Sequence, residues 1–256
     1  MKAISLVAMA AVGFAAPVFA ADFPAGPYTK APAMVAAIYD WSGFYVGANG
    51  GWGGDRKCWN LTNNGVAVVT PVGCNSGNGG IAGGQIGYRW QASNWVFGVE
   101  AQGDWANLKG SNVSLVNPLV TNQSRINALG LFTGHAGYAW GNVLLYLKGG
   151  AAVAADKYNG LGTATGIVFD QAKENRWGGT VGAGVEYAFA PNWSVGVEYD
   201  HLFMGNANNT FISTGMGPNN NAAAGTADRI VNIRQDVDMV TARINYRWGN
   251  PAAPRY

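Results

Sequence analysis

Cysteine and histidine are the residue types in this chain that most readily do chemistry, and the sequence holds two of each. Cys58 and Cys74 are the only cysteines, and they allow one pairing. In an oxidising compartment they would form a structural disulfide, whose loop closure stabilises by about 3 kcal/mol on the chain-entropy model. A metal or redox site would need further Cys or His ligands nearby, and the neighbouring sequence has none. We therefore predict a disulfide.

The two histidines are candidates for ligating hemin iron. His135 occupies a polar position of an alternating segment, beside Thr133 and Gly137, and His201 occupies an apolar position of another. A lone histidine is more often a structural or interfacial residue than a ligand. We therefore expect no bound metal and no cofactor, with hemin kept as an alternative.

Nucleophilic catalysis is not predicted. An activated nucleophile needs a base within reach, but His201 is followed by Leu202 and Phe203 rather than a serine, and no GxSxG motif occurs. The acidic residues of the alternating segments are matched by basic ones. We expect a protein that is not an enzyme.

The composition indicates unusual surroundings. The formal charge of +2 is too balanced to indicate a nucleic-acid partner. Charged residues make up 12% of the chain, about half of the ~25% usual in soluble domains. There are 38 glycines, yet aromatic residues reach 12%, which a disordered glycine-rich chain would lack.

The N-terminus predicts export. Residues 1–20 form a signal peptide with a basic start, an apolar stretch and the small-x-small site Val18-Phe19-Ala20. A membrane anchor is the weaker interpretation, because the apolar run is short and is broken by Gly and Pro. Residues 21–40 are rich in Pro and Ala and are expected to be an extended periplasmic segment.

From residue 42 onward the chain alternates apolar and small or polar residues. The clearest cases are 82–90, 95–105, 177–189, 193–200 and 240–248, and looser ones are 42–53, 126–140 and 143–154. Period two over roughly ten residues predicts a strand with one apolar face. The sequence therefore predicts eight strands within residues 41–249, with 250–256 as a C-terminal tail.

The connections between these strands alternate strictly between long and short. The long ones are 54–79, 106–125, 155–174 and 204–233, the last of them Asn- and Gly-rich and expected to be mobile, and the short ones are 91–94, 141–142 and 190–192. This layout predicts an all-β fold, an eight-stranded antiparallel up-and-down transmembrane β-barrel with short periplasmic turns and long extracellular loops. Both termini would then be periplasmic.

A soluble up-and-down barrel is the competing architecture. Its exterior would be rich in Lys and Glu, whereas the polar face here is mainly Gly, Ser, Thr, Asn and Gln. The charges on that face balance five against five, which suits a paired interior, because an unpaired buried charge costs several kcal/mol. We predict a charge network in the lumen, formed by Arg89, Glu100, Asp104, Lys148, Arg176, Glu186, Glu198, Asp200, Arg243 and Arg247.

The apolar face carries its large aromatic residues at the strand ends. Aromatic belts at both membrane–water interfaces would explain this, with the rings in lipid and the indole N–H near water. We expect Trp90, Trp95, Trp140, Phe189, Trp193 and Trp248 to form the periplasmic belt, and Trp52, Trp105 and Trp177 the extracellular one.

Several motifs resemble one known group. The chain is similar to the small alphaproteobacterial outer-membrane β-barrel family of porin-like surface antigens and hemin-binding proteins, a resemblance that runs from about residue 21 to 250. It implies an eight-stranded barrel in the outer membrane of a Gram-negative bacterium, without catalytic activity. The motifs are "YDWSGFYVGANGGWG" (39–53), "GGQIGYRWQ" (83–91), "LLYLKGGAA" (144–152), "GAGVEYAFAPNWSVGVEYDHL" (182–202) and "INYRW" (244–248).

One departure concerns the C-terminus, where such barrels usually end on an aromatic residue that the barrel-assembly machinery reads. Here either Tyr246 and Trp248 act as an internal signal, or Tyr256 caps the chain. We favour the internal signal, because Pro251 and Pro254 cannot donate to a strand ladder.

Three functions remain open from sequence. The leading one is a structural outer-membrane barrel that contributes to envelope integrity, displays its loops, and has outer-membrane lipids and lipopolysaccharide as neighbours. The second is a surface binding protein for hemin or another ligand. The third is a narrow, low-conductance channel, since eight strands enclose an interior that side chains can fill.

Overall fold

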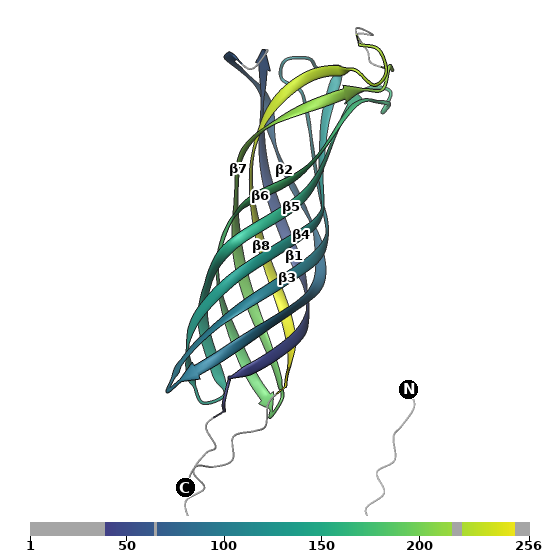
Figure 1. The fold of residues 1–256 in the computed structure, drawn as a ribbon. Coiled ribbons are helices and arrows are strands. Elements are labelled where there is room, and N and C mark those ends of the chain that lie inside the picture. Colours follow the sequence, from purple (N-terminus) through teal and green to yellow (C-terminus); the bar gives the residue numbers. More distant parts are fainter. Residues whose placement is uncertain (1–38, 64–65, 217–221, 249–256) are drawn as a thin grey trace, which may run out of the picture. The chain divides into compact units, whose positions relative to one another are not determined.

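A computed structural model describes residues 39–63, 66–216 and 222–248, and these form one closed antiparallel barrel (Figure 1). Each strand pairs with its sequence neighbours, and the first pairs with the last. The strands are β1 (Gly43–Asn63), β2 (Val66–Ala92), β3 (Trp95–Val113), β4 (Val120–Trp140), β5 (Val143–Gly162), β6 (Val168–Ala190), β7 (Trp193–Ser213) and β8 (Ala227–Trp248).

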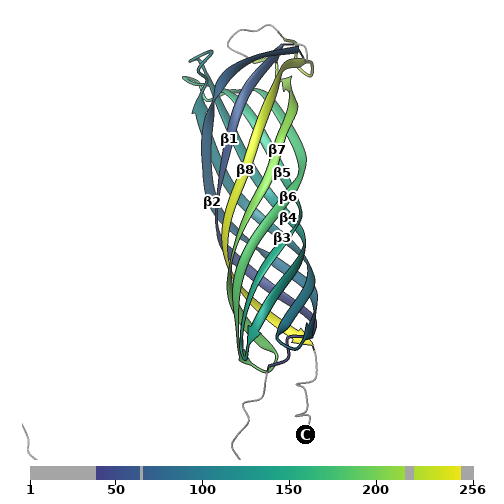
Figure 2. The ribbon, with the colours of Figure 1, turned by 90° about the vertical axis from the view of Figure 1, so that its left-hand side faces the viewer.

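The predicted fold is confirmed. The tight turns β2–β3, β4–β5 and β6–β7 gather at one end of the barrel, together with the start of β1 and the end of β8 (Figures 1 and 2). We call this the turn end and the opposite one the loop end. Among the described residues there is no helix with the length and apolar character to span a membrane. The signal peptide, most of the 21–40 segment and the 250–256 tail lie outside the described residues.

The predicted long loops are wrong in extent, because much of each is strand. β1 continues to Asn63 and β2 starts at Val66, where a loop was expected over 54–79. Likewise β3 and β4 leave only 114–119 between them, and β5 and β6 leave 163–167. The Asn- and Gly-rich connection narrows to 214–226 between β7 and β8.

The loop-end extensions of the strands were not predicted, because the apolar and polar faces of each strand change sides part-way along it. In the part near the turn end, outward residues are apolar, such as Val99 and Val197, and the buried charges such as Glu100 lie in the lumen. Near the loop end the lumen holds buried apolar residues such as Leu108 and Ile126, while cations such as Arg234 are exposed outside. A wall facing lipid and a wall facing water need opposite patterns. This inversion indicates that the barrel extends beyond the bilayer as a water-facing barrel.

Strand pairing is irregular near this border. The β3–β4 ladder shifts register between Trp105 and Leu108, and the β7–β8 ladder between Phe203 and Gly205. The β6–β7 register is broken between Gln171 and Gly179. Such irregularities locally increase twist and bend the strand, and they fall where the wall changes its surroundings.

The lumen is packed in alternating polar and apolar layers. An apolar cluster that includes Trp41 and Leu144 fills the turn end, and two further clusters lie toward the loop end, around Leu108 and around Trp59. Charged side chains separate these clusters. The layers can be followed along β5, whose inward residues run Leu144, Tyr146, Lys148, Ala152, Ala154, Asp156 and Tyr158.

Candidate functional site

The central feature of the lumen is a cluster of charges around Arg243 of β8. Its guanidinium donates to Glu198 from Nη1 at 2.7 Å and to Glu100 from Nη2 at 2.9 Å. Lys148 of β5 lies 2.7 Å from Glu198, 3.3 Å from Asp200 and 3.6 Å from Glu100. All these side chains are almost fully buried. The cluster therefore ties β3, β5, β7 and β8 together across the lumen.

Two buried tyrosines complete this cluster in the same way. The Tyr45 hydroxyl donates to Glu100 and the Tyr146 hydroxyl donates to Glu198, each with an O···O distance of 2.6 Å. Each tyrosine lies over a glycine of the next strand, Gly87 or Gly184, where an added Cβ would come within 2.5 Å of the ring. The glycines leave the space that lets each phenol reach its glutamate.

This duplicated arrangement is visible in the sequence. The stretch "NWVFGVE" at 94–100 recurs as "NWSVGVE" at 192–198, at the start of β3 and of β7. Each copy ends on the glutamate that binds Arg243, so the repeat would have singled out Glu100 and Glu198. Tyr45 and Tyr146 were missed because tyrosine on a polar face carries no charge to balance.

A second pair lies closer to the turn end. Arg89 of β2 and Glu186 of β6 form a bidentate contact of 3.0 and 2.7 Å. Ser194 also donates to Glu186, and the Arg89 guanidinium lies 4.3 Å from the centre of the Tyr45 ring. Bidentate arginine–carboxylate pairs are the more specific kind of ion pair, and this one joins opposite walls of the barrel.

Three of the ten predicted network residues do not join these pairs. Asp104 accepts from Gln102 instead of a cation. Arg176 binds the carbonyl of Ile233 and, on its own strand, Glu174. Arg247 donates to two backbone carbonyls, those of residues 42 and 191, and so closes the turn end. The single network expected from charge balance is therefore divided into the Arg243 cluster, the Arg89–Glu186 pair that meets it at Tyr45, and three further contacts. The division arises because a residue's position along its strand sets its height along the barrel axis, and only charges at similar heights can pair.

A further charged layer lies where a loop was expected. Lys57 of β1 lies 2.9 Å from Asp55 and 3.2 Å from Asp156 of β5, and all three are fully buried. Gln235 donates to Asp156 and accepts from the Tyr158 hydroxyl. Sequence reasoning missed this layer because it ended β1 before Asp55.

The disulfide is confirmed, but its setting differs from the one expected. Cys58 and Cys74 are bonded with an S–S distance of 2.05 Å. They are directly opposed residues of the β1–β2 ladder, not loop residues. The bond therefore fastens two strands in the water-facing part of the barrel.

The histidines occupy different surroundings. His135 is buried in the lumen beside the Tyr146 ring. His201 lies on the outer wall, where Nδ1 is 2.6 Å from Asp238 and the Tyr199 hydroxyl donates to the same carboxylate. Among the described residues, no group of three or more His, Cys, Asp or Glu could hold a metal ion. The expected absence of a cofactor stays a prediction, with hemin as the alternative.

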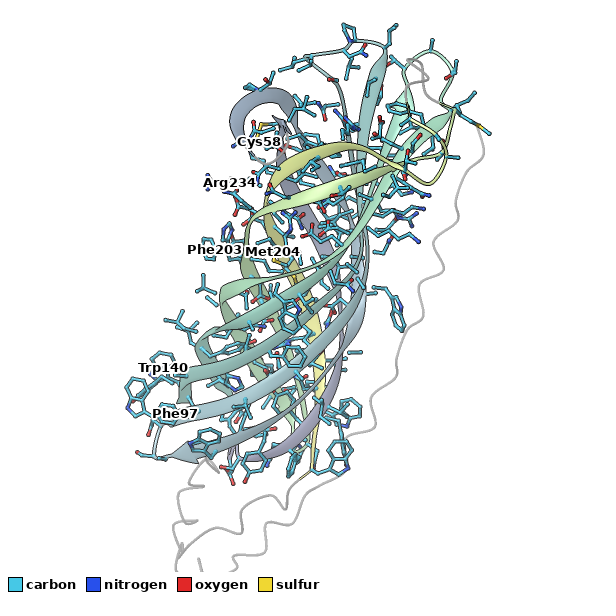
Figure 3. The ribbon with its side chains drawn as sticks, turned by 45° about the horizontal axis from the view of Figure 1, so that its top comes forward. Cys58, Phe97, Trp140, Phe203, Met204 and Arg234 are labelled. Carbon is cyan, nitrogen blue, oxygen red and sulfur yellow. A yellow bond between two sulfur atoms is a disulfide. The ribbon has the colours of Figure 1, made fainter. Side chains whose placement is uncertain are left out.

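All nine belt residues point outward, with 40–79% of their surface exposed. Figure 3 shows Trp140 directed away from the wall near the turn end. Trp95 and Trp105 are ten residues apart on β3, which is ~33 Å along a strand and ~25 Å along the axis at a tilt of about 40°. That spacing matches the apolar band of a membrane barrel. Their assignment to two interfaces stays a prediction.

Comparison with known proteins decides the family. The sequence profile described as outer membrane protein beta-barrel domain matches residues 6–219. The chain belongs to this outer-membrane β-barrel family. Family membership bears out the resemblance seen in the motifs and places the chain in the outer membrane.

Similar sequences and similar solved structures of other proteins align with most of this outer-membrane barrel. It is 29% identical over 223 residues to the 31 kDa outer-membrane immunogenic protein of Brucella melitensis, covering 81% of this chain and 89% of that one. It is 30% identical over 215 residues to the 25 kDa outer-membrane immunogenic protein of Brucella abortus, covering 84% and 90%. Among solved structures, OprG from Pseudomonas aeruginosa is 12% identical with a TM-score of 0.47, covering 82% of this chain and 98% of that one. Neisserial surface protein A is 14% identical with a TM-score of 0.37, covering 81% and 98%.

Proposed function

We propose that this outer-membrane barrel is a non-conducting, non-enzymatic structural protein that contributes to envelope integrity and displays its loop end to the environment. The observation that carries the proposal is the filled lumen. Successive layers around Trp41, Arg243, Leu108 and Trp59 are buried. An ion path would have to break the paired charges and cross apolar layers, which is costly.

The proposed orientation places the turn end in the periplasm and the loop end outside. Outer-membrane barrels have short periplasmic turns, and β1 begins and β8 ends at the turn end. Both termini would then be periplasmic. Tyr246 and Trp248, which close β8, would serve as the signal for the barrel-assembly machinery.

Orientation is tested with single cysteines and a maleimide that does not cross the membrane. Ala164→Cys lies in the exposed β5–β6 loop, and Ser93→Cys in the exposed β2–β3 turn. Intact cells should label Ala164→Cys alone, while lysed cells should label both. Labelling of Ser93→Cys in intact cells would reverse the orientation.

The envelope role is tested in a strain that lacks the protein. We expect higher sensitivity to SDS with EDTA and greater leakage of a periplasmic enzyme, both restored by the wild-type chain. A chain whose lumen cluster is broken by Arg243→Met should restore them less well at equal surface abundance. Unchanged sensitivity and leakage in the deletion strain would refute the proposal.

A further inference from the structure

Four cations form a continuous row on the outer wall, one on each of β3, β4, β5 and β6. Lys109 is directly opposite Arg125, Arg125 is directly opposite Lys157, and Lys157 is directly opposite Lys173. All four face outward, three of them exposed and Lys157 half-buried. Directly opposed strand residues have Cβ atoms about 5 Å apart, and like charges in such pairs are destabilising.

No ion pair within the described part of the chain offsets this repulsion. The ion pairs among the described residues involve other cations, and none includes a member of the row. On the outer wall, for example, Arg234 lies 3.7 Å from Asp236. The opposite side of the barrel carries mixed charges, since β8 presents Asp236 and Asp238 outward. The basic row therefore gives one side of the water-facing wall a local positive charge that an external anion would stabilise.

The height of the row indicates where that anion lies. Lys109 comes four residues after Trp105 on β3, and Lys173 comes four residues before Trp177 on β6. Four residues span ~13 Å along a strand, or ~10 Å along the axis at a tilt of about 40°. If Trp105 and Trp177 mark the edge of the hydrocarbon, the row lies among the lipid headgroups rather than at the barrel tip.

The centre of the row has further donors beside it. Asn127 and Asn175 line a depression of 510 Å³ together with Lys157 and Lys173. Asp156 and Glu174 also border it, but their carboxylates are paired with Lys57 and Arg176. Asn127 is exposed at the register shift between Ile126 and Ala128 of β4. Lysine ammonium groups and asparagine amides both donate hydrogen bonds, and phosphate oxygens accept several at once.

We propose that the basic row binds the phosphate groups of a phosphorylated glycolipid in the outer leaflet, with Lys157, Lys173, Asn127 and Asn175 as the central contacts. The proposal rests on the proposed orientation, because the loop end must face the leaflet that holds this lipid. Labelling of Ala164→Cys tests that orientation separately, so the two can fail independently.

The test compares lipid binding by the full chain in nanodiscs of neutral phospholipid doped with bis-phosphorylated lipid A or with lipid A stripped of its phosphates. The row variant carries K109Q, R125Q, K157Q and K173Q. The control carries R56Q and R234Q, two exposed cations on β1 and β8, and removes as many charges as the double variant K157Q with K173Q. Heat-modifiable gel migration shows that each variant is folded, and K157Q with K173Q alone replaces the row variant if that one does not fold.

At about 1 kcal/mol per basic residue near an anionic surface, the row variant should bind phosphorylated lipid A roughly 100- to 1000-fold more weakly at low salt. The control variant should change binding less than about threefold, because Asp236 lies opposite Arg56 and 3.7 Å from Arg234 and offsets their charge. Wild type should prefer the phosphorylated lipid. Equal affinity of wild type and row variant, or equal binding of both lipids, would overturn the proposal. So would inorganic phosphate or a sulfated polysaccharide that competes as well as phosphorylated lipid A, because the ligand would then be a soluble anion.

Discussion

Removing the Arg243 guanidinium is the most direct way to test the lumen cluster. Arg243→Met keeps an unbranched side chain of similar length but leaves Glu100 and Glu198 without their shared donor. Breaking a buried ion pair by removing one partner typically costs about 3–5 kcal/mol, because an uncompensated charge remains. Lys148 can still serve Glu198 at 2.7 Å, whereas it lies 3.6 Å from Glu100. Glu100 should therefore be the carboxylate left with the least compensation of its charge.

The unequal distances from Lys148 to the two glutamates predict which second substitution restores stability. Glu100→Gln removes the orphaned charge and should recover about 2 kcal/mol or more of the loss in the Arg243→Met background. Glu186→Gln, which disturbs the separate Arg89 pair, should add to the damage instead. Residues that do not share a contact are expected to be additive within about 0.5 kcal/mol.

The assay is reversible urea unfolding in lipid vesicles, followed by tryptophan fluorescence, on the four variants of each double-mutant cycle. A loss below about 1 kcal/mol for Arg243→Met would refute the view that the cluster holds the walls together. Equal rescue by Glu186→Gln would refute the separation of the two clusters.

The remaining predictions concern the glycines, the lipid-facing wall and the disulfide. Gly87→Ala should push Tyr45 off Glu100 and lower the free energy of unfolding by about 1–3 kcal/mol through overpacking. Gly103→Ala, with open space around its Cβ, should lower it by less than about 0.5 kcal/mol in the same unfolding assay. Equal losses would contradict the tyrosine–glycine fit. Val99 faces outward about midway between Trp95 and Trp105, so Val99→Arg should lower the free energy of unfolding in vesicles by about 2–4 kcal/mol if the residue faces the bilayer centre. Gln123→Arg near the loop end should lower it little. An unchanged stability of Val99→Arg would indicate a water-facing wall. Cys58→Ser with Cys74→Ser should lower the free energy of unfolding by up to about 3 kcal/mol, with the same loss in wild type under reducing conditions, and an unchanged unfolding midpoint in both would show that strand pairing alone fastens this region.

The membrane-spanning part of the barrel follows from sequence because its pattern is simple. An apolar outer face, a polar inner face and tight turns such as that between Trp90 and Trp95 each reflect one physical requirement of a bilayer. Glu100 and Glu198 were recognisable as lumen residues for the same reason. Their shared contact with Arg243 was not, because pairing across the lumen depends on strand stagger, which period-two alternation does not encode.

The water-facing part could not be predicted with the same rule. Leu108 and Ile126 point inward and Lys109 points outward, so the alternation that marks a membrane strand is reversed there. Glycine and asparagine further weaken it, and the segments around Cys58 and Cys74 were therefore expected as loops. If each strand is tested for a change of polarity beyond its loop-end tryptophan, the predicted β1 extends past Trp52 to the charged layer of Asp55 and Lys57.

The central claim is that the lumen is sealed, and single-channel recording tests it most directly. Purified wild-type chain is reconstituted into vesicles, which are fused with a planar bilayer in concentrated KCl. Heat-modifiable migration of protein recovered from these vesicles shows that it is folded, and a general porin is the positive control. We predict no discrete conductance steps from wild type, because the layers around Trp41, Arg243 and Leu108 fill the lumen. Reproducible steps of uniform size from the wild-type chain would contradict a sealed barrel and make it a channel.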